Sequence, residues 1–85
     1  MPLMTLWLAT AAAALPPADV KAFVERRAQC GHWAGEEPYD PARGREIAAA
    51  MRRLRCDTID ADAARLRQRH QRTPGVAKLL DDPEQ

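Results

Sequence analysis

No charged side chain occurs between Met1 and Leu15, although charged residues make up 29% of the chain. This apolar segment ends in small residues at positions 12–14, just before Pro16-Pro17. Its core of about a dozen apolar residues falls short of the roughly twenty that a transmembrane helix needs. A short apolar core followed by small residues is typical of a secretory signal peptide. We therefore predict a signal peptide over 1–14, with a cleavage point as late as position 18.

The same segment lacks Lys and Arg, so the positive charge expected at its start rests on the terminal amine alone. The alternative interpretation is an uncleaved apolar helix that serves as a partner surface or a loose membrane anchor. No cysteine lies near the cleavage region, which argues against a lipid-anchored form. The predicted location is periplasmic or secreted, with no stable membrane span after cleavage.

Cysteine is scarce, since Cys30 and Cys56 are the only two in the chain. An even number in an exported protein favours a disulfide, because compartments outside the cytoplasm are oxidising. Closing a loop of this length stabilises the fold by about 3 kcal/mol in chain-entropy terms. Because small domains are stable by only about 5 kcal/mol, such a bond decides whether the domain folds.

Large apolar side chains are also few. Beyond the predicted signal peptide the only aromatic residues are Phe23, Trp33 and Tyr39, which leaves a thin core for a single domain over 15–82. Strand-like alternation, hairpin turn signals and internal repeats are all lacking. We predict an all-α domain of three to four helices stapled by one disulfide, with a frayed tail over 83–85.

Residues that commonly cap helices predict where each helix begins and ends. The first helix is expected to begin at Pro16-Pro17 and end at Gly31, and the second to begin at Asp40-Pro41 and end at about Cys56. The third is expected to begin at Asp60 and the fourth at Thr73-Pro74. Apolar spacing places one stripe per helix toward the core: Val20, Phe23 and Val24; Ile47, Met51 and Leu54; Ala63, Leu66 and His70; Val76, Leu79 and Leu80. Arg26 and Arg27 fall near the negative end of the first helix dipole. The disulfide would join two helix C-termini, so the loop between these helices must run back along them, or the helices must cross steeply.

Lysine is nearly absent, and arginine carries the positive charge. Nine arginines against four acidic residues give 43–72 an excess of five positive charges, whereas 15–42 and 73–85 each carry two net negative charges. Pairing between the acidic ends and the basic middle is the simpler interpretation. The alternative is a basic face for nucleic acid, anionic lipid or acidic glycan, made of Arg52, Arg53, Arg55, Arg65 and Arg69. No aromatic residues are interleaved with these arginines, so no nucleic-acid partner is expected.

The segment 31–40 contains two glycines and a proline and is expected to be a loop. It holds most of the unusual side chains, which form the candidate binding loop: His32, Trp33, Glu36, Glu37, Tyr39 and Asp40. One interpretation is structural, with Trp33 and Tyr39 packed on the apolar faces and the acidic residues paired with arginines. The other is a recognition surface, because loops carry binding and Trp and Tyr make good anchors.

No motif in the chain dictates a reaction, and no cofactor is expected. A zinc site would need Cys30, His32, Cys56 and His70, but their spacing matches none of the common patterns, and a disulfide would consume the thiols. An acid/base pair of His32 with Glu36 or Glu37 would need an enclosed cleft that so small a domain hardly offers. A Cys30–His32 nucleophile would need a free thiolate. His70 is expected at the edge of the core.

The segment Cys30 to Asp40 reads CGHWAGEEPYD, and it is followed by Arg43 or Arg45, by Cys56 and by the Leu66-Arg67 region. In these features the chain resembles a group of small exported bacterial proteins that share a C-x-H-aromatic-x-G-E-E-P-Y-D segment and a short C-terminal helix. No function is assigned to that group, so the resemblance implies a bacterial periplasmic setting and nothing catalytic. His70 departs from the pattern, in which an aromatic residue is expected.

These observations favour a small non-enzymatic protein that binds a protein or cell-envelope partner through the 31–40 loop and the arginine face. Two alternatives stay open. One is a metal-binding protein that uses His32, Glu36, Glu37 and Asp40, and the other is a small hydrolase.

Overall fold

A computed structural model describes residues 15–82, so the predicted signal peptide over 1–14 and the tail over 83–85 lie outside the described residues. The elements are α1 (Ala18–Ala34), α2 (Pro41–Arg53), the 3-10 turn η1 (Cys56–Thr58), α3 (Ile59–Arg69) and α4 (Val76–Asp81). No strand occurs in the described part, which confirms the all-α prediction. None of the helices within 15–82 combines the length and the apolar character required to cross a membrane.

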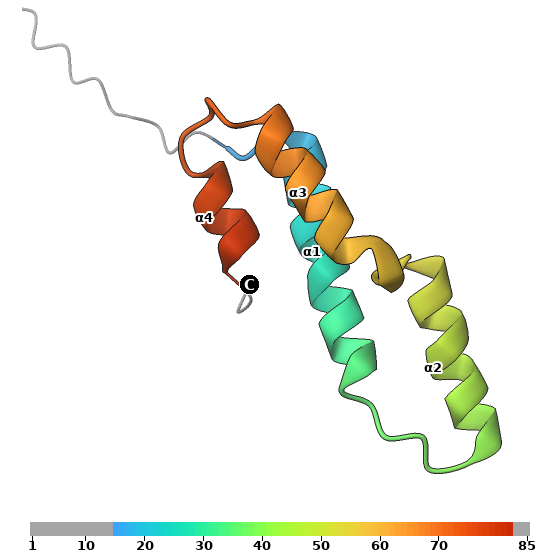
Figure 1. Cartoon of the computed structure of the whole chain (residues 1–85). Helices are drawn as coiled ribbons and strands as arrows, with labels where there is room; N and C mark the ends of the chain where they lie inside the picture. Colours follow the sequence, from blue (N-terminus) through green and yellow to red (C-terminus); the bar gives the residue numbers. More distant parts are fainter. Residues whose placement is uncertain (1–14, 83–85) are drawn as a thin grey trace, which may run out of the picture.

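Helix α1 is the axis of the molecule. Helices α3 and α4 lie beside its N-terminal half, whereas α2 lies beside its C-terminal half and points away from the other two (Figure 1). We call this second part, formed by the end of α1, the 35–40 connection and α2, the hairpin arm. The arrangement separates a three-helix core from a two-helix projection.

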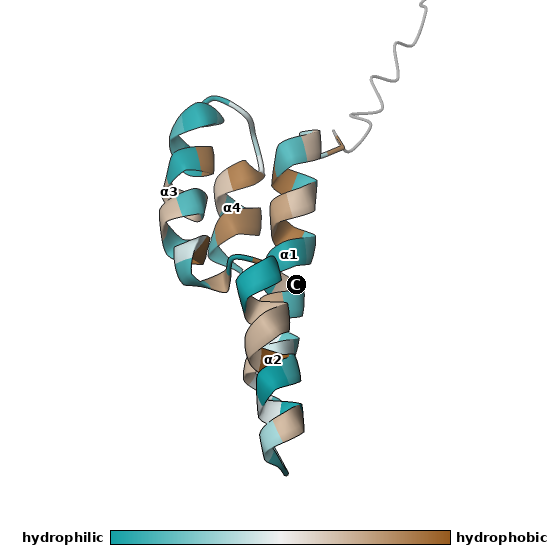
Figure 2. Ribbon diagram, turned by 90° about the vertical axis from the view of Figure 1, so that its right-hand side faces the viewer, coloured by the Kyte–Doolittle hydropathy of each residue, from teal (hydrophilic) through white to brown (hydrophobic). Residues whose placement is uncertain are grey.

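The core cluster belongs to the first part. Val20, Phe23, Val76 and Leu80 are at most 5% exposed and pack together. Five partly buried residues surround them: Val24, Ile59, Ala63, Leu66 and Leu79. Figure 2 shows the apolar surface of the short helix α4 between α1 and α3, so the inward stripes predicted for α1, α3 and α4 are confirmed.

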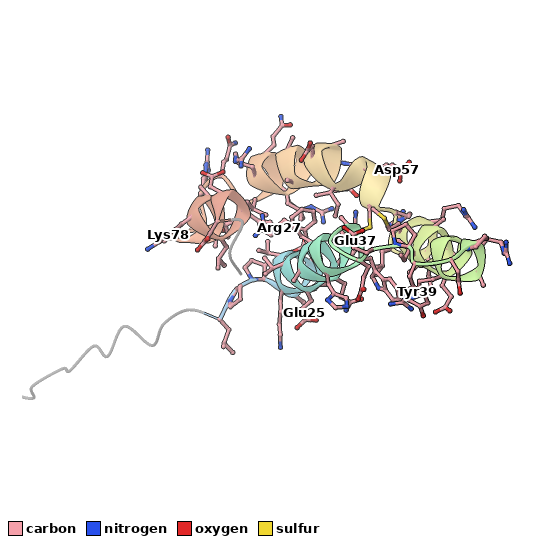
Figure 3. All side chains as sticks on the ribbon, turned by 90° about the horizontal axis from the view of Figure 1, so that it is seen from below. Glu25, Arg27, Glu37, Tyr39, Asp57 and Lys78 are labelled. Carbon is pink, nitrogen blue, oxygen red and sulfur yellow. A yellow bond between two sulfur atoms is a disulfide. The ribbon has the colours of Figure 1, made fainter. Side chains whose placement is uncertain are left out.

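Two adjacent arginines on α1 bind the C-terminal ends of two other helices. Arg26 donates from Nε to the carbonyl of Leu54, just after α2, at 2.7 Å. Arg27 donates to the carbonyls of Leu79, Leu80 and Asp82 at 2.6–2.8 Å and lies between α1 and α4 (Figure 3). These carbonyls belong to helix ends, which lack partners within their own helix. Both guanidinium groups therefore act as caps for other helices and not for α1 itself.

The Phe23 ring contacts both of these arginines. The guanidinium carbons of Arg26 and Arg27 lie 5.5 and 5.6 Å from the centre of its ring. Such distances allow cation–π attraction, which strengthens when the groups are partly desolvated. The only described aromatic residue in the core therefore holds both capping arginines.

The prediction that α1 ends at Gly31 is wrong. The helix continues to Ala34, and Gly35 is its C-cap in a right-handed conformation. Gly31 remains inside the helix, where its carbonyl accepts from the Gly35 amide at 3.1 Å. Because glycine is tolerated in a helix at a cost of only about 1 kcal/mol, the side-chain contacts of the following turn outweigh its preference to end the helix.

Three other predicted ends also differ. Helix α2 begins as predicted, since Asp40 accepts from the Arg43 amide at 2.7 Å, but it ends at Arg53 and not near Cys56. Helix α3 begins at Ile59, so Asp60 lies in its first turn and is not its N-cap. Helix α4 begins after Gly75, whose φ of 86° only glycine adopts without strain, so Thr73-Pro74 forms the preceding turn.

The predicted disulfide is present, with Cys30 and Cys56 Cα atoms 5.6 Å apart. The 35–40 connection runs beyond the end of α1 before α2 returns antiparallel to it (Figure 1). Helix α2, with 13 residues, rises roughly 20 Å. Because α2 begins beyond the end of α1, it returns far enough to bring Cys56 level with Cys30. The two helices therefore pair without a steep crossing, and the loop does not fold back over them.

Removing the disulfide through Cys30→Ser with Cys56→Ser is expected to lower the free energy of unfolding by about 3 kcal/mol. Helix α2 buries only Ala50, and none of its residues joins the core cluster, so the arm should loosen first. Hydrogen exchange should show a larger loss of protection in α2 than in α3. Equal losses in the two helices would mean that packing alone holds the arm.

Replacing Arg27 by Met removes three hydrogen bonds from a charged donor to the end of α4. We expect a loss of about 2 kcal/mol in urea unfolding, because bonds to charged groups contribute roughly 1.5–3 kcal/mol and their loss leaves carbonyls unpaired. Arg53→Met, at an exposed arginine of α2, is the control and should change stability by less than about 0.5 kcal/mol. Similar effects of both variants would contradict the capping role.

Candidate functional site

The outer end of the hairpin arm gathers several residues of the candidate binding loop. Trp33 lies in the last turn of α1, and the Arg43 guanidinium carbon sits 5.2 Å from its ring centre. Arg43 also reaches Glu36 at 3.5 Å and Glu46 at 2.9 Å. One arginine from α2 thus joins the end of α1, the connection and its own helix. We call Trp33, Glu36, Tyr39 and Arg43 the arm tip.

The charge environment of Arg43 follows from these contacts. Partial desolvation acts to lower its pKa, but the nearby Glu36 and Glu46 carboxylates outweigh this and raise the pKa above the usual arginine value. The guanidinium therefore stays charged. It attracts the Trp33 ring through a cation–π interaction, and its N–H groups interact with the Glu36 and Glu46 carboxylates.

The His32–Glu36 pair exists but is an open one. His32 Nε2 lies 3.4 Å from Glu36 Oε1, one helical turn further along, and the histidine side chain is 69% exposed. The same carboxylate oxygen also contacts Arg43. A general base needs a positioned substrate and gains from exclusion of water, whereas this pair lies on the surface. The contact joins the last turn of α1 to the 35–40 connection.

The remaining members of the candidate loop have separate roles. Asp40 is the N-cap of α2. Glu37 is exposed and has no side-chain partner within residues 15–82. Tyr39 is 78% exposed, so the expectation that it packs on the apolar faces is wrong. Glu37 and Tyr39 lie near the turn into α2 in Figure 3.

Trp33 behaves differently from Tyr39. It is half-buried and lines a hollow of about 340 Å³ between the end of α1 and α2, together with Pro38, Ile47 and Met51. Gly44 belongs to the same hollow, and a Cβ there would lie 3.7 Å from Pro38, an ordinary van der Waals contact. Trp33 is therefore near apolar side chains of α2, as expected, but it lies in the last turn of α1 and not in a loop folded over the helices. Pro38, the residue before the exposed Tyr39, also lines the hollow.

The predicted basic face divides into two parts. Arg55, Arg65 and Arg69 line one groove of about 590 Å³ between α1 and α3, and Arg26 also contributes to it. Phe23 and Leu66 form its apolar side. Arg52 lies outside this groove but shares a neighbouring hollow with Arg55. Arg53 lines neither hollow and is exposed on α2.

Two aspartates partly neutralise the groove. Asp62 accepts from Arg26 and Arg65 at 2.5 Å and from the Thr58 hydroxyl at 2.9 Å. The Arg26 hydrogen bond is the main reason that the pKa of Asp62 lies below its usual value, and Thr58 adds to the effect. Asp62 therefore stays ionised and links α3 to the end of α2 through Arg26.

Asp19 forms the second link. Its carboxylate oxygens lie 3.0 Å from His70 Nε2, and Arg69 donates to it at 3.0 Å. The contact with His70 is the main cause that lowers the pKa of Asp19, although partial desolvation opposes it. His70 lies at the core edge, as predicted, with 16% of its side chain exposed. Asp19 thus ties the start of α1 to the end of α3.

The structure does not assemble the zinc set considered from sequence. Both cysteines are in the disulfide, and His70 contacts Asp19. Across residues 15–82 no three His, Cys, Asp or Glu side chains converge closely enough to hold a metal ion. The set His32, Glu36, Glu37 and Asp40 is likewise not such a group, since Asp40 caps α2.

Sequence reasoning missed the most connected residues. Arg26, Arg27 and Arg43 bind groups that are distant in the chain or across a helix connection, whereas spacing alone assigned Arg26 and Arg27 to the dipole of their own helix. A usable signal was the position of Arg27 on the apolar side of the first helix. An arginine in that position must find partners when the face is buried.

Comparison of the chain with protein-family models, curated proteins and solved structures gave no match.

The depressed pKa of Asp62 predicts an acid-sensitive fold. Because the carboxyl has a lower pKa when folded than when unfolded, it stabilises the fold above about pH 4, and this contribution is lost as the pH falls through the folded-state value. Asp62→Asn should lower stability at pH 7 and flatten the decline below about pH 4. Asp60→Asn, an exposed neighbour on α3, is the control in urea titrations at each pH. An unchanged acid limb in Asp62→Asn would contradict the role of this pair.

Proposed function

We propose that this protein is a small non-enzymatic periplasmic or secreted protein that binds a protein or cell-envelope partner through the arm tip and the arginine face. The observation that carries the proposal is Tyr39, 78% exposed at the outer end of a projecting arm. The fold has few aromatic side chains and a thin core, yet it leaves this one in solvent. Tyrosine is among the residues most enriched at the energetic centres of protein interfaces.

The shape of the arm supports binding at its end. Helix α2 adds one buried residue, Ala50, and the core cluster is complete without it. Its stabilising contacts are the disulfide, the Arg26 cap and the Trp33–Arg43 stack. These contacts tie the arm to α1, and Tyr39 directly follows Pro38, which lines the apolar hollow. A rigid aromatic anchor next to a hollow reduces the entropy lost on binding.

The chemistry of the surface supports a protein partner more than a reaction. Aromatic, acidic and basic groups alternate over the arm tip, as at polar interface rims. The His32 side chain is 69% exposed, so water reaches the His32–Glu36 pair. Export is supported by the Cys30–Cys56 disulfide, since structural disulfides belong to oxidising compartments.

Tyr39→Ala tests the proposal because truncation of so exposed a side chain should leave the helical circular dichroism unchanged. In crosslinking capture from the native cell envelope, quantified by mass spectrometry, we expect at least a tenfold loss of the specific partner. Trp33→Ala should reduce capture similarly but also lower thermal stability, because Trp33 is half-buried and stacked on Arg43.

Lys78→Ala is the control. Lys78 is exposed on α4, at the opposite end of the molecule from Tyr39 (Figure 3). Its removal should leave capture unchanged. If Tyr39→Ala captures the same proteins at the same yield as the unaltered chain, the arm tip is not the binding surface and the proposal fails.

A further inference from the structure

Arg55 adopts a backbone conformation that few residues accept. With φ and ψ both at 52°, it is the only residue other than glycine in residues 15–82 with positive φ. Left-handed backbone costs a non-glycine residue roughly 1–2 kcal/mol. Glycine or asparagine would stand here with less strain, since both are common where a helix ends in this way. The fold requires the conformation but does not require arginine.

The backbone of Arg55 is what the fold uses. Its carbonyl accepts from the Thr58 amide and hydroxyl at 3.2 Å each, and from Arg26 Nη2 at 3.4 Å. Its side chain, by contrast, has no partner among residues 15–82. A strained residue whose side chain serves no internal contact points to a use outside the fold.

The side chain of Arg55 lies where positive charge accumulates. It lines the groove of about 590 Å³ with Arg26, Arg65 and Arg69, and also the adjoining hollow of about 610 Å³ that Arg52 borders. Within the first groove, four arginines face two aspartates, which leaves a net charge of +2. The groove is thus under-neutralised, although the chain as a whole carries a net charge of only +1.

The guanidinium groups of the groove keep donors to offer. Arg65 uses Nη2 on Asp62, and Arg69 uses Nη1 on Asp19. Each guanidinium has five N–H donors, so each retains donors after these bonds. Both side chains are 70% exposed or more, so the remaining donors are accessible. Arg26 is different, because Leu54, Arg55 and Asp62 already occupy it.

We infer that this groove binds the phosphate group of a ligand, with Arg55, Arg65 and Arg69 as its donors. A phosphate oxyanion accepts several bonds at once, and the planar arginine fork matches its oxygens. A volume of about 590 Å³ is within the range of small-molecule sites and leaves room for more than the phosphate itself. Phe23 borders the groove but is only 3% exposed, so the partly buried Leu66 is the apolar side chain open to a ligand, which would be a phosphate ester with a small apolar or neutral portion.

This inference gives a ligand class to the arginine face and rests on the proposed function only in assigning that face to binding. Two sources supply the chemistry: a soluble phosphate ester, or the headgroup of an anionic phospholipid. Glycerol 3-phosphate represents the first source. Vesicles of phosphatidylglycerol in phosphatidylcholine represent the second, with pure phosphatidylcholine as the neutral reference.

The decisive variant is Arg55→Asn. Asparagine removes the guanidinium and accepts left-handed backbone more readily than arginine, so thermal stability should be kept or raised. Affinity should fall about tenfold, because a hydrogen bond to a charged group contributes roughly 1.5–3 kcal/mol and about 1.4 kcal/mol is tenfold. Arg45→Asn removes the same charge from an exposed site on α2 outside both hollows and is the matched control.

The measurement uses the oxidised full chain in each variant. Binding of glycerol 3-phosphate is followed by NMR of the arginine side-chain N–H signals, and vesicle binding by sedimentation, at two salt concentrations. A tenfold loss in Arg55→Asn, with Arg45→Asn unchanged, supports the site. If Arg55→Asn loses affinity in both assays, the groove recognises the phosphate group itself, whether soluble or in a headgroup. If it loses affinity for vesicles alone, the source is the lipid.

Two results would overturn the inference. One is the absence of binding to both probes. The other is binding that Arg55→Asn and Arg45→Asn weaken equally, which would reflect general charge attraction. Neither result depends on Tyr39, so partner capture by the arm tip is tested separately, and either proposal can fail while the other holds.

Discussion

The remaining structure depends on the hydrogen bonds that Arg26 and Arg27, in the middle of α1, donate to carbonyls at the ends of α2 and α4. Arg27 closes the end of α4 and Arg26 closes the end of α2, while Phe23 lies against both. A helix of six residues such as α4 is not stable by itself, because helix nucleation costs more than so few hydrogen bonds return. The hydrogen bonds from Arg27 to three carbonyls at its end therefore stabilise it. The same pair also fixes where the arm leaves the core, because the Arg26 cap marks the end of α2.

Covalent and ionic links then complete what the thin core cannot supply. The disulfide holds the arm to α1, Asp62 holds α3 to Arg26, and Asp19 holds the end of α3 to the start of α1. Each link joins parts that are distant in the chain. The Arg26 and Asp62 side chains are only 20% and 17% exposed, so their ion pair is less screened by water than a pair in open solvent. The molecule is therefore stabilised by a few specific contacts around a small cluster, which leaves much of its surface available for binding.

The two candidate surfaces use what this framework leaves over. At the arm tip, Arg43 orders Trp33 while Tyr39 stays in solvent. In the groove, Arg26 and the two aspartates make hydrogen bonds that join helices. The Arg55 side chain and the remaining N–H donors of Arg65 and Arg69 make no such bonds within residues 15–82. Both surfaces consist of side chains whose backbone or neighbours are structurally fixed. This is the arrangement that lets a small domain present rigid contacts without a large core.

The amino-acid sequence by itself determined the all-α class, the disulfide, the Asp40 start of α2 and the inward stripes of α1, α3 and α4, because these follow from local periodicity, capping chemistry and cysteine number. Tertiary structure alone decided that α1 continues past Gly31, that Tyr39 stays exposed, and that Arg26 and Arg27 cap other helices. It also placed Arg55 in a left-handed conformation. The reason is physical: these outcomes depend on which distant carbonyl, carboxylate or ring a side chain meets, and no local spacing encodes that distance.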